Sequence, residues 1–385
     1  MSLAGCHNIA DLRRVARRKL PAPVFHYIDG GADDEWSLRN NTRAFDRYEL
    51  VPSQLSDVSR IDTSSTLFGR PVDWPVMISP TGASKLFHAG GEPAVARAAK
   101  TFGMVYSLST LGTTTIADVA ASATGPKLFQ LYVFRDRGLA RELVGLARQH
   151  DYAALALTVD TPVGGNRERD FVYGFSATPR SRLRQVLSFA RHPYWVWRAA
   201  VRKDLEMVNI TRSEAGADIT GSLREYVDRE LDRSLTWKDV EWLRKTWDGP
   251  LVIKGVQSVD DCRRAADAGA TAVMLSNHGG RQLESAPAPI DCVAAVADAL
   301  RDRLEIICDG GIRRGNHIVK ALAAGANAVG IGRAYLWGLA AGGEAGVERA
   351  LGILRDEFER TLALTGCSDV SSLVRGHLRR SRDEF

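Results

Sequence analysis

The sequence predicts an α/β protein built as a single (β/α)8 TIM barrel, with helices before the first strand and a long insertion after the fourth. Three observations predict this fold. Eight short apolar segments each end in polar residues or glycine, as buried parallel strands do. Amphipathic, alanine-rich segments separate most of them. The spacing between segments is mostly that of one strand–helix unit, about 25–30 residues.

Each predicted strand is a run of apolar residues closed by a polar or glycine residue. In chain order the eight runs are residues 75–80, 104–109, 127–132, 154–160, 251–254, 272–277, 305–309 and 328–332. The clearest helices between them are predicted over residues 92–102, 138–150, 258–268 and 315–324.

Two long stretches depart from the regular spacing. More than 90 residues separate strands four and five, which predicts an insertion over about residues 171–235, above the C-terminal face of the barrel. About 70 residues precede the first strand, and we expect them to form helices that cap the opposite face. The whole chain, residues 1–385, is then one domain.

A doubly wound parallel sheet would show the same alternation of strands and helices. Such sheets usually carry a GxGxxG sequence at the first strand–helix turn. Here that turn reads Ser-Pro-Thr-Gly over residues 79–82, so the barrel is favoured.

The composition is that of a soluble globular protein, with 45% hydrophobic and 25% charged residues. The five cysteines are scattered, with no CxxC pair and no metal-ligand spacing. Without a recognisable signal peptide, this usage predicts a cytoplasmic protein. No apolar run is long enough for a membrane-spanning helix. The net charge of +5 is modest, and no zinc-finger, RNP-like or P-loop pattern indicates nucleic-acid binding.

Polar side chains recur where the predicted strands end, which is where barrel enzymes place their functional groups. These strand-end positions are residues 79–82, Ser109, Gln130, Tyr132, Thr158, Asp160, Lys254, residues 276–278, residues 309–311, Gly332 and Arg333. So regular a placement of hydrogen-bonding and charged groups predicts an enzyme that handles a large, polar ligand.

Glycine-rich turns follow strands seven and eight. They read Asp-Gly-Gly-Ile-Arg-Arg over residues 309–314 and Gly-Ile-Gly-Arg over residues 330–333. Either one alone is explained as a tight turn. Because many barrels bind phosphate with backbone N–H groups at these two loops, the pair predicts a phosphate site.

The segment Ser-Asn-His-Gly-Gly-Arg-Gln, residues 276–282, follows strand six. A histidine such as His278 can accept a proton near neutral pH, and Arg281 can bind a carboxylate through two parallel hydrogen bonds. An isolated histidine would more often cap a helix. Between a strand end and a glycine turn, catalysis is the favoured interpretation.

Over nearly its whole length the chain resembles the FMN-dependent 2-hydroxy acid dehydrogenases and oxidases, a family that includes L-lactate dehydrogenase, mandelate dehydrogenase and glycolate oxidase. The most specific motif is Ser-Asn-His-Gly-Gly-Arg, residues 276–281. Matching segments also include residues 25–35, 343–347 and 354–358. The resemblance implies a TIM barrel, FMN as cofactor, and a homo-tetramer.

Carried over by matching motif, the family's catalytic base is His278 and its carboxylate partner is Asp160. The substrate-facing residues implied by the resemblance are Tyr27, Tyr132, Arg167 and Arg281, of which Tyr132 also belongs to the catalytic group. Arg281 is the main carboxylate-binding arginine, with Arg167 as the second. The alternative for Tyr27 is a packing role.

The resemblance also assigns a cofactor site. Lys254 would stabilise the anionic reduced flavin near N1 and O2, and its alternative is a rim lysine paired with Asp160. The backbone of Pro80, Thr81 and Gly82 would pass near flavin N5. Ser109, Gln130, Thr158 and Ser276 would bind the ring edge, and Asp309, Gly311, Arg313, Gly332 and Arg333 the ribityl and phosphate groups.

These roles suit the oxidation of an (S)-2-hydroxy acid to the 2-keto acid. The reaction removes one proton and two electrons from the same carbon–oxygen unit, so a base needs an electron acceptor beside it. Two arginines can fix the carboxylate so that the carbinol carbon faces both. Hydride transfer and a carbanion mechanism use the same residues and both remain open.

Two positions bear on substrate and acceptor. Plant glycolate oxidases carry tryptophan where this chain has Leu111, so a larger substrate fits here, with lactate as the first expectation and a mandelate-like acid as the second. Oxidase relatives often have alanine where this chain has Gly82, which favours a dehydrogenase over an oxidase that uses O2 and releases H2O2. With no haem domain expected before the barrel, the acceptor is expected to be quinone or another molecule.

The insertion predicts contact with a membrane. Residues 171–203 contain seven lysines and arginines and no acidic residue. Basic residues interleaved with apolar and aromatic ones suit a segment that lies on an anionic membrane. These apolar residues are Leu183, Val186, Leu187, Phe189, Tyr194, Trp195, Val196 and Trp197. The protein would then be peripheral on the inner face of the plasma membrane. The alternative is packing against the barrel or a neighbouring subunit.

Residues 216–222 are small and polar and predict a loop.

Two other classes of protein fit the sequence less well. A barrel enzyme for phosphosugars or nucleotides would use the phosphate loops but leave His278, Arg281 and Lys254 without a joint task. A non-catalytic, membrane-associated ligand-binding barrel would need none of these side chains.

Overall fold

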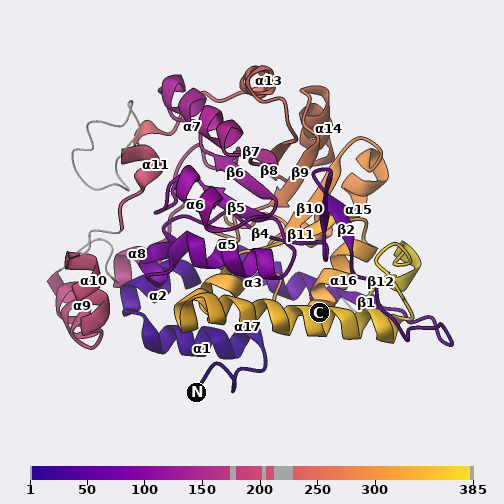
Figure 1. Ribbon diagram of the computed structural model, residues 1–385, viewed down its shortest axis with the longest axis horizontal. Helices are drawn as coiled ribbons and strands as arrows, with labels where there is room; N and C mark the ends of the chain where they lie inside the picture. Colours follow the sequence, from indigo (N-terminus) through magenta and orange to yellow (C-terminus); the bar gives the residue numbers. More distant parts are fainter. Residues whose placement is uncertain (1, 174–178, 202–204, 212–228, 382–385) are drawn as a thin grey trace.

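A closed ring of parallel strands forms the centre of the molecule (Figure 1). The computed structural model describes residues 2–173, 179–201, 205–211 and 229–381. The strand order around the eight-stranded sheet is β4-β11-β10-β9-β8-β7-β6-β5, and a parallel bridge between Met77 and Val105 joins its two ends. The strands are β4 (Val76–Ile78), β5 (Tyr106–Ser109), β6 (Lys127–Leu131), β7 (Ala154–Thr158), β8 (Leu251–Val256), β9 (Ala272–Ser276), β10 (Glu305–Asp309) and β11 (Ala328–Ile331). All eight predicted strands are confirmed.

Nearly every residue of these strands is buried, because helices cover the outside of the ring and side chains fill the inside. A separate inner cluster includes Met77, Leu128, Val252, Met274 and Ile307. This double burial explains why the strands are continuously apolar rather than alternating.

Helices follow the strands, and the four helices predicted most clearly are confirmed as α5, α7, α14 and α16. The helices that flank the barrel are α4 (Ser84–Phe87), α5 (Gly91–Thr101), α6 (Ile116–Ser122), α7 (Arg137–Gln149), α13 (Trp237–Thr246), α14 (Val259–Asp267), α15 (Pro289–Leu300), α16 (Gly315–Ala323) and α17 (Arg333–Thr365). Side-chain caps fix several starts, such as Asp136 at α7 and Ser258 at α14. The backbone leaves helical geometry at Gly342 and Gly343, where α17 bends.

The segment before the barrel lies differently from the prediction. It contains α1 (Ile9–Lys19), α2 (Ala22–Asp29), α3 (Trp36–Arg43) and the short 3-10 helix η1 (Ala44–Arg47). We expected these helices to cap the face opposite the strand ends, and this was wrong. Asn41 in α3 exchanges two amide hydrogen bonds of 2.7 Å with Asn277, just past the end of β9. Ala32 N–H donates to Gly280 O over 2.8 Å.

A β-hairpin closes the opposite face instead. Its strands are β2 (Ser65–Leu67) and β3 (Arg70–Val72), and Leu67 and Phe68 join the inner cluster of the barrel. Phe68 N–H donates over 3.0 Å to the carboxylate of Glu305, the first residue of β10. A further two-stranded sheet pairs β1 (Tyr48–Leu50) with β12 (Leu378–Arg380), and the 3-10 helix η2 (Arg375–His377) precedes β12.

The insertion between β7 and β8 is helical where it is described. It contains α8 (Glu168–Tyr173), α9 (Pro179–Ala190), α10 (Pro193–Val201) and α11 (Val208–Thr211), with α9 and α10 at the left edge of Figure 1. The loop predicted at residues 216–222 lies outside the described residues. Within the described part of the chain, no helix combines the length and apolar character needed to cross a bilayer.

Candidate active site

A histidine–aspartate pair stands at the C-terminal ends of the strands. His278 follows β9 and Asp160 follows β7, and His278 Nδ1 lies 3.0 Å from Asp160 Oδ1. His278 has φ +57°, a left-handed conformation that is uncommon for a side chain of this size. Its backbone N–H donates to Ser276 Oγ over 3.1 Å, which supports this conformation. The outer nitrogen, Nε2, lies 3.4 Å from the Tyr132 hydroxyl.

The electrostatics keep the pair in the states that a general base needs. Burial lowers the pKa of His278 below its usual value, while the Asp160 charge opposes this shift. Burial alone would raise the pKa of Asp160, but His278 and Lys254 outweigh it, and the pKa of Asp160 is lowered. At neutral pH the imidazole is therefore neutral and the carboxylate is ionised, so Nε2 is free to accept a proton.

Two arginines and a tyrosine gather beside this pair. The guanidinium carbon of Arg281 lies 5.0 Å from the centre of the Tyr27 ring, a cation–π contact. Burial lowers the pKa of Arg281, and the nearby charge of Arg167 lowers it further. Arg167 Nε donates to Asp170 Oδ2 over 3.0 Å. Two neighbouring guanidinium groups can receive a carboxylate bidentately.

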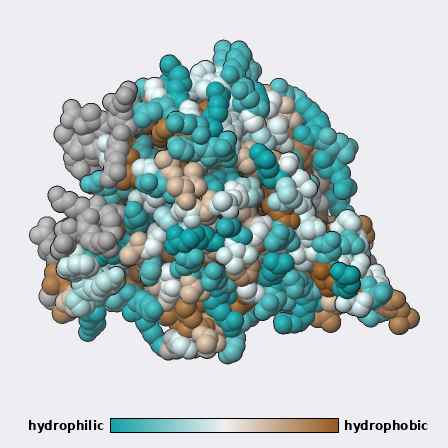
Figure 2. All heavy atoms as spheres, in the orientation of Figure 1, coloured by the Kyte–Doolittle hydropathy of each residue, from teal (hydrophilic) through white to brown (hydrophobic). Residues whose placement is uncertain are grey.

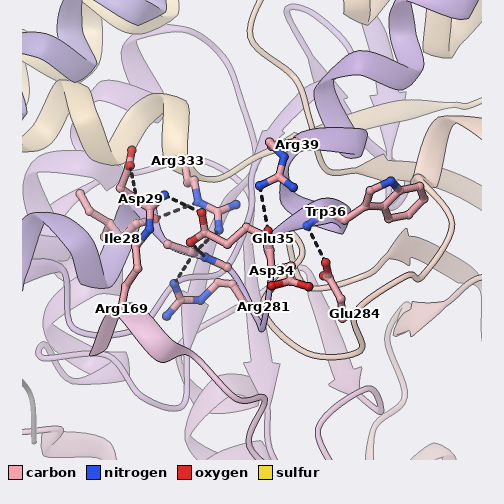
Figure 3. A network of polar contacts seen from close by, with 12 residues as sticks. Ile28, Asp29, Asp34, Glu35, Trp36, Arg39, Arg169, Arg281, Glu284 and Arg333 are labelled. Carbon is pink, nitrogen blue, oxygen red and sulfur yellow. Dashed lines mark hydrogen bonds and ion pairs between the residues drawn. The ribbon is translucent and has the colours of Figure 1, made fainter. Parts of the chain in front are cut away.

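The C-terminal end of α2 holds Arg281 and a third arginine, Arg333, in place (Figure 3). Arg281 Nη1 donates to Tyr27 O over 2.6 Å and to Gly30 O over 3.2 Å. Arg333 donates to Ile28 O and Gly30 O, both over 2.8 Å, and to Gly279 O over 2.8 Å. The last carbonyl groups of a helix carry partial negative charge, so α2 stabilises both arginines there.

A line of buried polar groups crosses the mouth of the barrel from β5 to β7. Ser109 Oγ donates to Gln130 Oε1 over 2.7 Å, and Gln130 Nε2 donates to Thr158 Oγ1 over 2.9 Å. These three residues, predicted at the ring edge, thus lie together and in a fixed order.

Lys254, in β8, continues this line, because β8 pairs with β7 and Lys254 stands in register with Thr158. Its Nζ lies 3.4 Å from Ser276 Oγ and 3.6 Å from Asp309 Oδ2. Its ion pair is therefore with Asp309, and not with Asp160 as in the alternative interpretation. Asp309 also accepts hydrogen bonds from Ser79 (2.6 Å) and Ser276 (2.8 Å). The cation is buried beside the polar rim, where it can act on an anionic ring edge.

The glycine turns after β10 and β11 bring two half-buried arginines, Arg313 and Arg333, together. Burial lowers the pKa of Arg313 to about 10 and that of Arg333 to about 9, and neighbouring arginines add to the effect on Arg333. The hydrogen bonds of Arg333 within the described residues go to carbonyl oxygens. Such desolvated cations favour an anion. Together with open space beside Gly332, where a Cβ would meet nothing within 4 Å, this donor set fits a phosphate group.

The turn after β4 passes close to the turn after β5. A Cβ on Gly82 would lie 3.0 Å from Leu111 Cβ and 3.1 Å from Leu111 O. Ala83 N–H donates to Leu111 O over 2.9 Å. Thr81, beyond Pro80, pairs its hydroxyl with that of Tyr335. A glycine therefore fits between these two turns without displacing Leu111.

The structure brings together the predicted site residues, gives contacts to two strand-end residues that had no assigned role, and adds Glu92, which the sequence did not indicate. Ser79 binds Asp309, and Asn277 joins the motif to α3. Glu92 is fully buried in α5 and accepts hydrogen bonds from Thr113, Thr114 and Ser84 N–H, which ties the turns after β4 and β5 together. In the sequence, the available signal for this role was a glutamate within a predicted alanine-rich helix.

Comparisons with known proteins agree with this site. A family model for FMN-dependent dehydrogenases matches residues 16–380. Glycolate oxidase 3 of Oryza sativa subsp. indica is 39% identical over 378 residues, which cover 98% of this chain and 97% of that protein. Glycolate oxidase of Spinacia oleracea is 39% identical over 376 residues, covering 98% and 96%.

The fold is also that of solved enzymes. A structure of the monotopic membrane protein (S)-mandelate dehydrogenase has a TM-score of 0.89 at 37% identity, covering 98% of this chain and 100% of that one. A structure of mandelate oxidase with (S)-4-hydroxymandelic acid has a TM-score of 0.84 at 35% identity, covering 97% and 98%. With FMN fitting the polar rim and the half-buried arginines, the chain belongs to the family of FMN-dependent dehydrogenases that oxidise 2-hydroxy acids.

Proposed function

We propose that this protein is a dehydrogenase of (S)-2-hydroxy acids that favours a mandelate-like acid and passes the electrons to quinone. The observation that carries the proposal is the His278–Asp160 pair, which stands beside Arg281 and Arg167. This arrangement supplies a base and a carboxylate site within one small space.

Each side chain has a defined task in the reaction. The arginines bind the substrate carboxylate and turn the carbinol group toward His278. His278 Nε2 accepts the proton, and the negative charge of Asp160 stabilises the imidazolium that results. Bound FMN supplies the acceptor for the two electrons. Tyr132, 3.4 Å from Nε2, donates a hydrogen bond near the reacting oxygen.

Two observations support an aromatic substrate. Leu111 occupies the position where plant glycolate oxidases carry tryptophan, which leaves room for a side chain larger than that of glycolate. The solved structures at 37% and 35% identity are mandelate enzymes. We therefore place the mandelate-like acid before lactate, the reverse of the order that the sequence alone suggested, and keep lactate as the second candidate.

Gly82 supports a dehydrogenase over an oxidase. The relatives that use O2 often have alanine at this position, and here the neighbouring Leu111 lies within 3.1 Å of where a Cβ would stand. The curated glycolate oxidases, at 39% identity, favour the competing activity with O2. Reoxidation in air distinguishes the two.

Helices α9 and α10 support contact with a membrane. Side chains exposed on them include Val186 (63%), Leu187 (50%), Tyr194 (67%) and Trp197 (51%). In Figure 2, brown atoms lie among pale and teal ones at the lower left, where Figure 1 draws these helices. On the inner side of α10, Trp195 Nε1 donates to Leu86 O over 2.8 Å, which attaches the helix to the barrel.

This two-sided arrangement suits an amphipathic segment on an anionic bilayer, where quinone is available. We propose that the protein is peripheral on the inner face of the plasma membrane. Trp195 partly fits the alternative interpretation, because it packs inward. The Leu183 side chain lies outside the described residues.

The first experiment is an anaerobic visible spectrum of the purified holoenzyme, recorded before and after addition of (S)-mandelate, (S)-lactate or glycolate. We expect (S)-mandelate to bleach the flavin fastest, the (R) enantiomer to leave it yellow, and the colour to return slowly in air but quickly with a soluble quinone. Fastest bleaching by glycolate, or immediate reoxidation by air, would favour a glycolate or mandelate oxidase instead.

Membrane contact is tested by sedimentation with vesicles of phosphatidylglycerol and phosphatidylcholine. We expect the wild-type protein to bind the anionic vesicles and the double variant Leu187→Ser, Trp197→Ser to remain in solution with normal activity. The control Leu55→Ser removes an exposed apolar side chain from a distant loop and is expected to bind like the wild type. Equal binding of all three proteins would contradict the proposal.

A further inference from the structure

The loop that carries Arg167 is attached, on its outer side, to the segment after α2. Arg169 makes this attachment (Figure 3). Its Nη1 donates to Asp29 Oδ2 over 3.1 Å, and its Nη2 donates to the carboxylate of Glu35. Arg167 and Arg169 are two residues apart, so one arginine serves the candidate substrate site while the other holds the loop to α2 and α3.

Both carboxylates that receive Arg169 are buried and are already fixed by other groups. The Asp29 side chain is 3% exposed and the Glu35 side chain 12%. Arg13 donates to both oxygens of Asp29, over 2.5 and 2.7 Å. Gly31 N–H donates to Glu35 Oε1 over 2.9 Å. Charged hydrogen bonds to rigid, desolvated partners stabilise more than a pair on the open surface does.

The loop needs such an attachment because of the charge that it carries. Arg167 and Arg281 share the carboxylate site, and each raises the cost of the other's positive charge until an anion lies between them. The loop continues into α8, which has six residues, and a helix this short is not stable by itself. The loop and α8 therefore depend on contacts with the rest of the molecule, and the Arg167–Asp170 ion pair offsets only part of the repulsion between the two arginines.

Further contacts join the same two segments. Asn166 Nδ2 donates to Asp33 Oδ1 over 2.8 Å, and Asp33 N–H donates to Asn166 O over 2.8 Å. The Tyr173 ring stacks on His26, with 3.7 Å between the ring centres. Burial, followed by the charge of Arg169, lowers the pKa of His26 to about 4. His26 is neutral at pH 7 and adds no positive charge beside Arg169.

We propose that Arg169 is a positioning residue for the substrate carboxylate. Through Asp29 and Glu35 it fixes the loop after β7 so that Arg167 stays opposite Arg281 before any anion binds. The C-terminal end of α2 also holds Arg281, through Tyr27 O and Gly30 O. Both arginines of the carboxylate site are therefore positioned by the same part of the molecule. The inference rests on the proposed function, because it takes Arg167 and Arg281 as the carboxylate site.

The test compares Arg169→Met and Arg169→Lys with Arg13→Met in the holoenzyme. Arg13 binds the same Asp29. Among the described residues, no hydrogen bond joins Arg13 to the loop that carries Arg167. For Arg169→Met we expect the dissociation constant of oxalate, measured by its perturbation of the flavin spectrum, to rise about tenfold, as for loss of one charge-assisted pair. KM should rise similarly while kcat changes less than about threefold.

Arg169→Lys should recover part of the affinity, because lysine keeps the charge but not the two-pronged geometry. Arg13→Met should lower the melting temperature and leave the oxalate affinity within about twofold of wild type. Without ligand, amide hydrogen exchange of residues 166–173 should be faster in Arg169→Met than in Arg169→Lys or Arg13→Met.

Unchanged oxalate affinity in Arg169→Met, or an equal loss in Arg13→Met, would overturn the proposal. A wild-type enzyme whose flavin no 2-hydroxy acid reduces would instead contradict the proposed function. In that case the exchange rates still decide whether Arg169 fixes the loop.

Discussion

At the scale of single residues, the histidine–aspartate pair carries the chemistry. We expect His278→Gln to keep FMN and the fold but to lose turnover by roughly 10²–10⁴-fold, the usual contribution of a positioned base. The measurement is the rate of anaerobic flavin reduction by the hydroxy acid. Glutamine preserves the size of the side chain, so a normal visible spectrum and melting temperature serve as controls. Near-normal reduction would remove His278 from the mechanism.

The pH dependence follows from the direction of the pKa shifts. His278 acts as a base only when neutral, and burial places its pKa below the usual 6.5. We therefore expect kcat/KM to be flat above neutral pH and to fall as the pH drops through that lowered pKa. The Asp160 charge raises the pKa of His278, so Asp160→Asn should move the fall to still lower pH and reduce the plateau.

The control for this profile is Asp298→Asn. Asp298 lies in α15 and forms an exposed surface pair with Arg375, and its ion pairs and hydrogen bonds among the described residues include no site residue. Its variant should reproduce the wild-type pH profile. A profile of Asp160→Asn that shifts to higher pH would contradict the assigned direction.

Single residues were predictable where a short motif carries them. His278 and Arg281 stand in one six-residue sequence, and the strand-end rule located Lys254, Asp160 and the ring-edge residues. Asp29 and Arg169 were not predicted, because they come from segments about 140 residues apart and each looks like an ordinary surface charge in sequence. Their burial and pairing exist only in the folded chain.

At the scale of elements, the docking of α3 on the turn after β10 depends on a glycine. Gly311 has φ +78°, and a Cβ there would lie 1.9 Å from Asn41 O. We expect Gly311→Ala to cost roughly 1–3 kcal/mol or more of unfolding free energy and to weaken FMN binding. Urea unfolding and fluorescence titration with FMN measure the two effects.

The matched control is Gly145→Ala. Gly145 lies inside α7, and a Cβ there would meet nothing within 4 Å. Alanine should stabilise this helix by about 0.5–1 kcal/mol. Equal, small effects of both substitutions would mean that α3 shifts freely, and that its position does not depend on the turn.

Strands and the main helices were predictable because double burial gives continuous apolar runs. The hairpin β2–β3 was missed, since its strands have three residues each and include exposed polar ones. The side on which the N-terminal helices lie was also missed. Helical periodicity indicates which face of a helix is buried, but not against which end of a barrel it packs.

At the scale of the whole molecule, we expect bound FMN to link loops from most of the barrel strands. Removing it should lower the melting temperature, and a ligand at 100 times its dissociation constant contributes about 2.7 kcal/mol. Because Arg313 and Arg333 are partly desolvated cations, inorganic phosphate alone should restore part of the loss in the apoprotein, whereas chloride at equal ionic strength should not. Arg333→Met should abolish the phosphate effect. Calorimetry of the holoprotein, of the apoprotein alone and with each salt, and of the Arg333→Met apoprotein with and without phosphate tests this.

The closure of the ring has a consequence for synthesis. Strand β4 finds one of its two neighbours, β11, only after about 250 further residues have left the ribosome. At about 5–20 residues per second, that interval is roughly 10–50 s. During it, the bare edge of β4 and the apolar face meant for β11 are exposed in the nascent chain, where they can pair with other chains. Chaperone dependence during translation, rather than weakness of the finished protein, is therefore the expected limit on its yield.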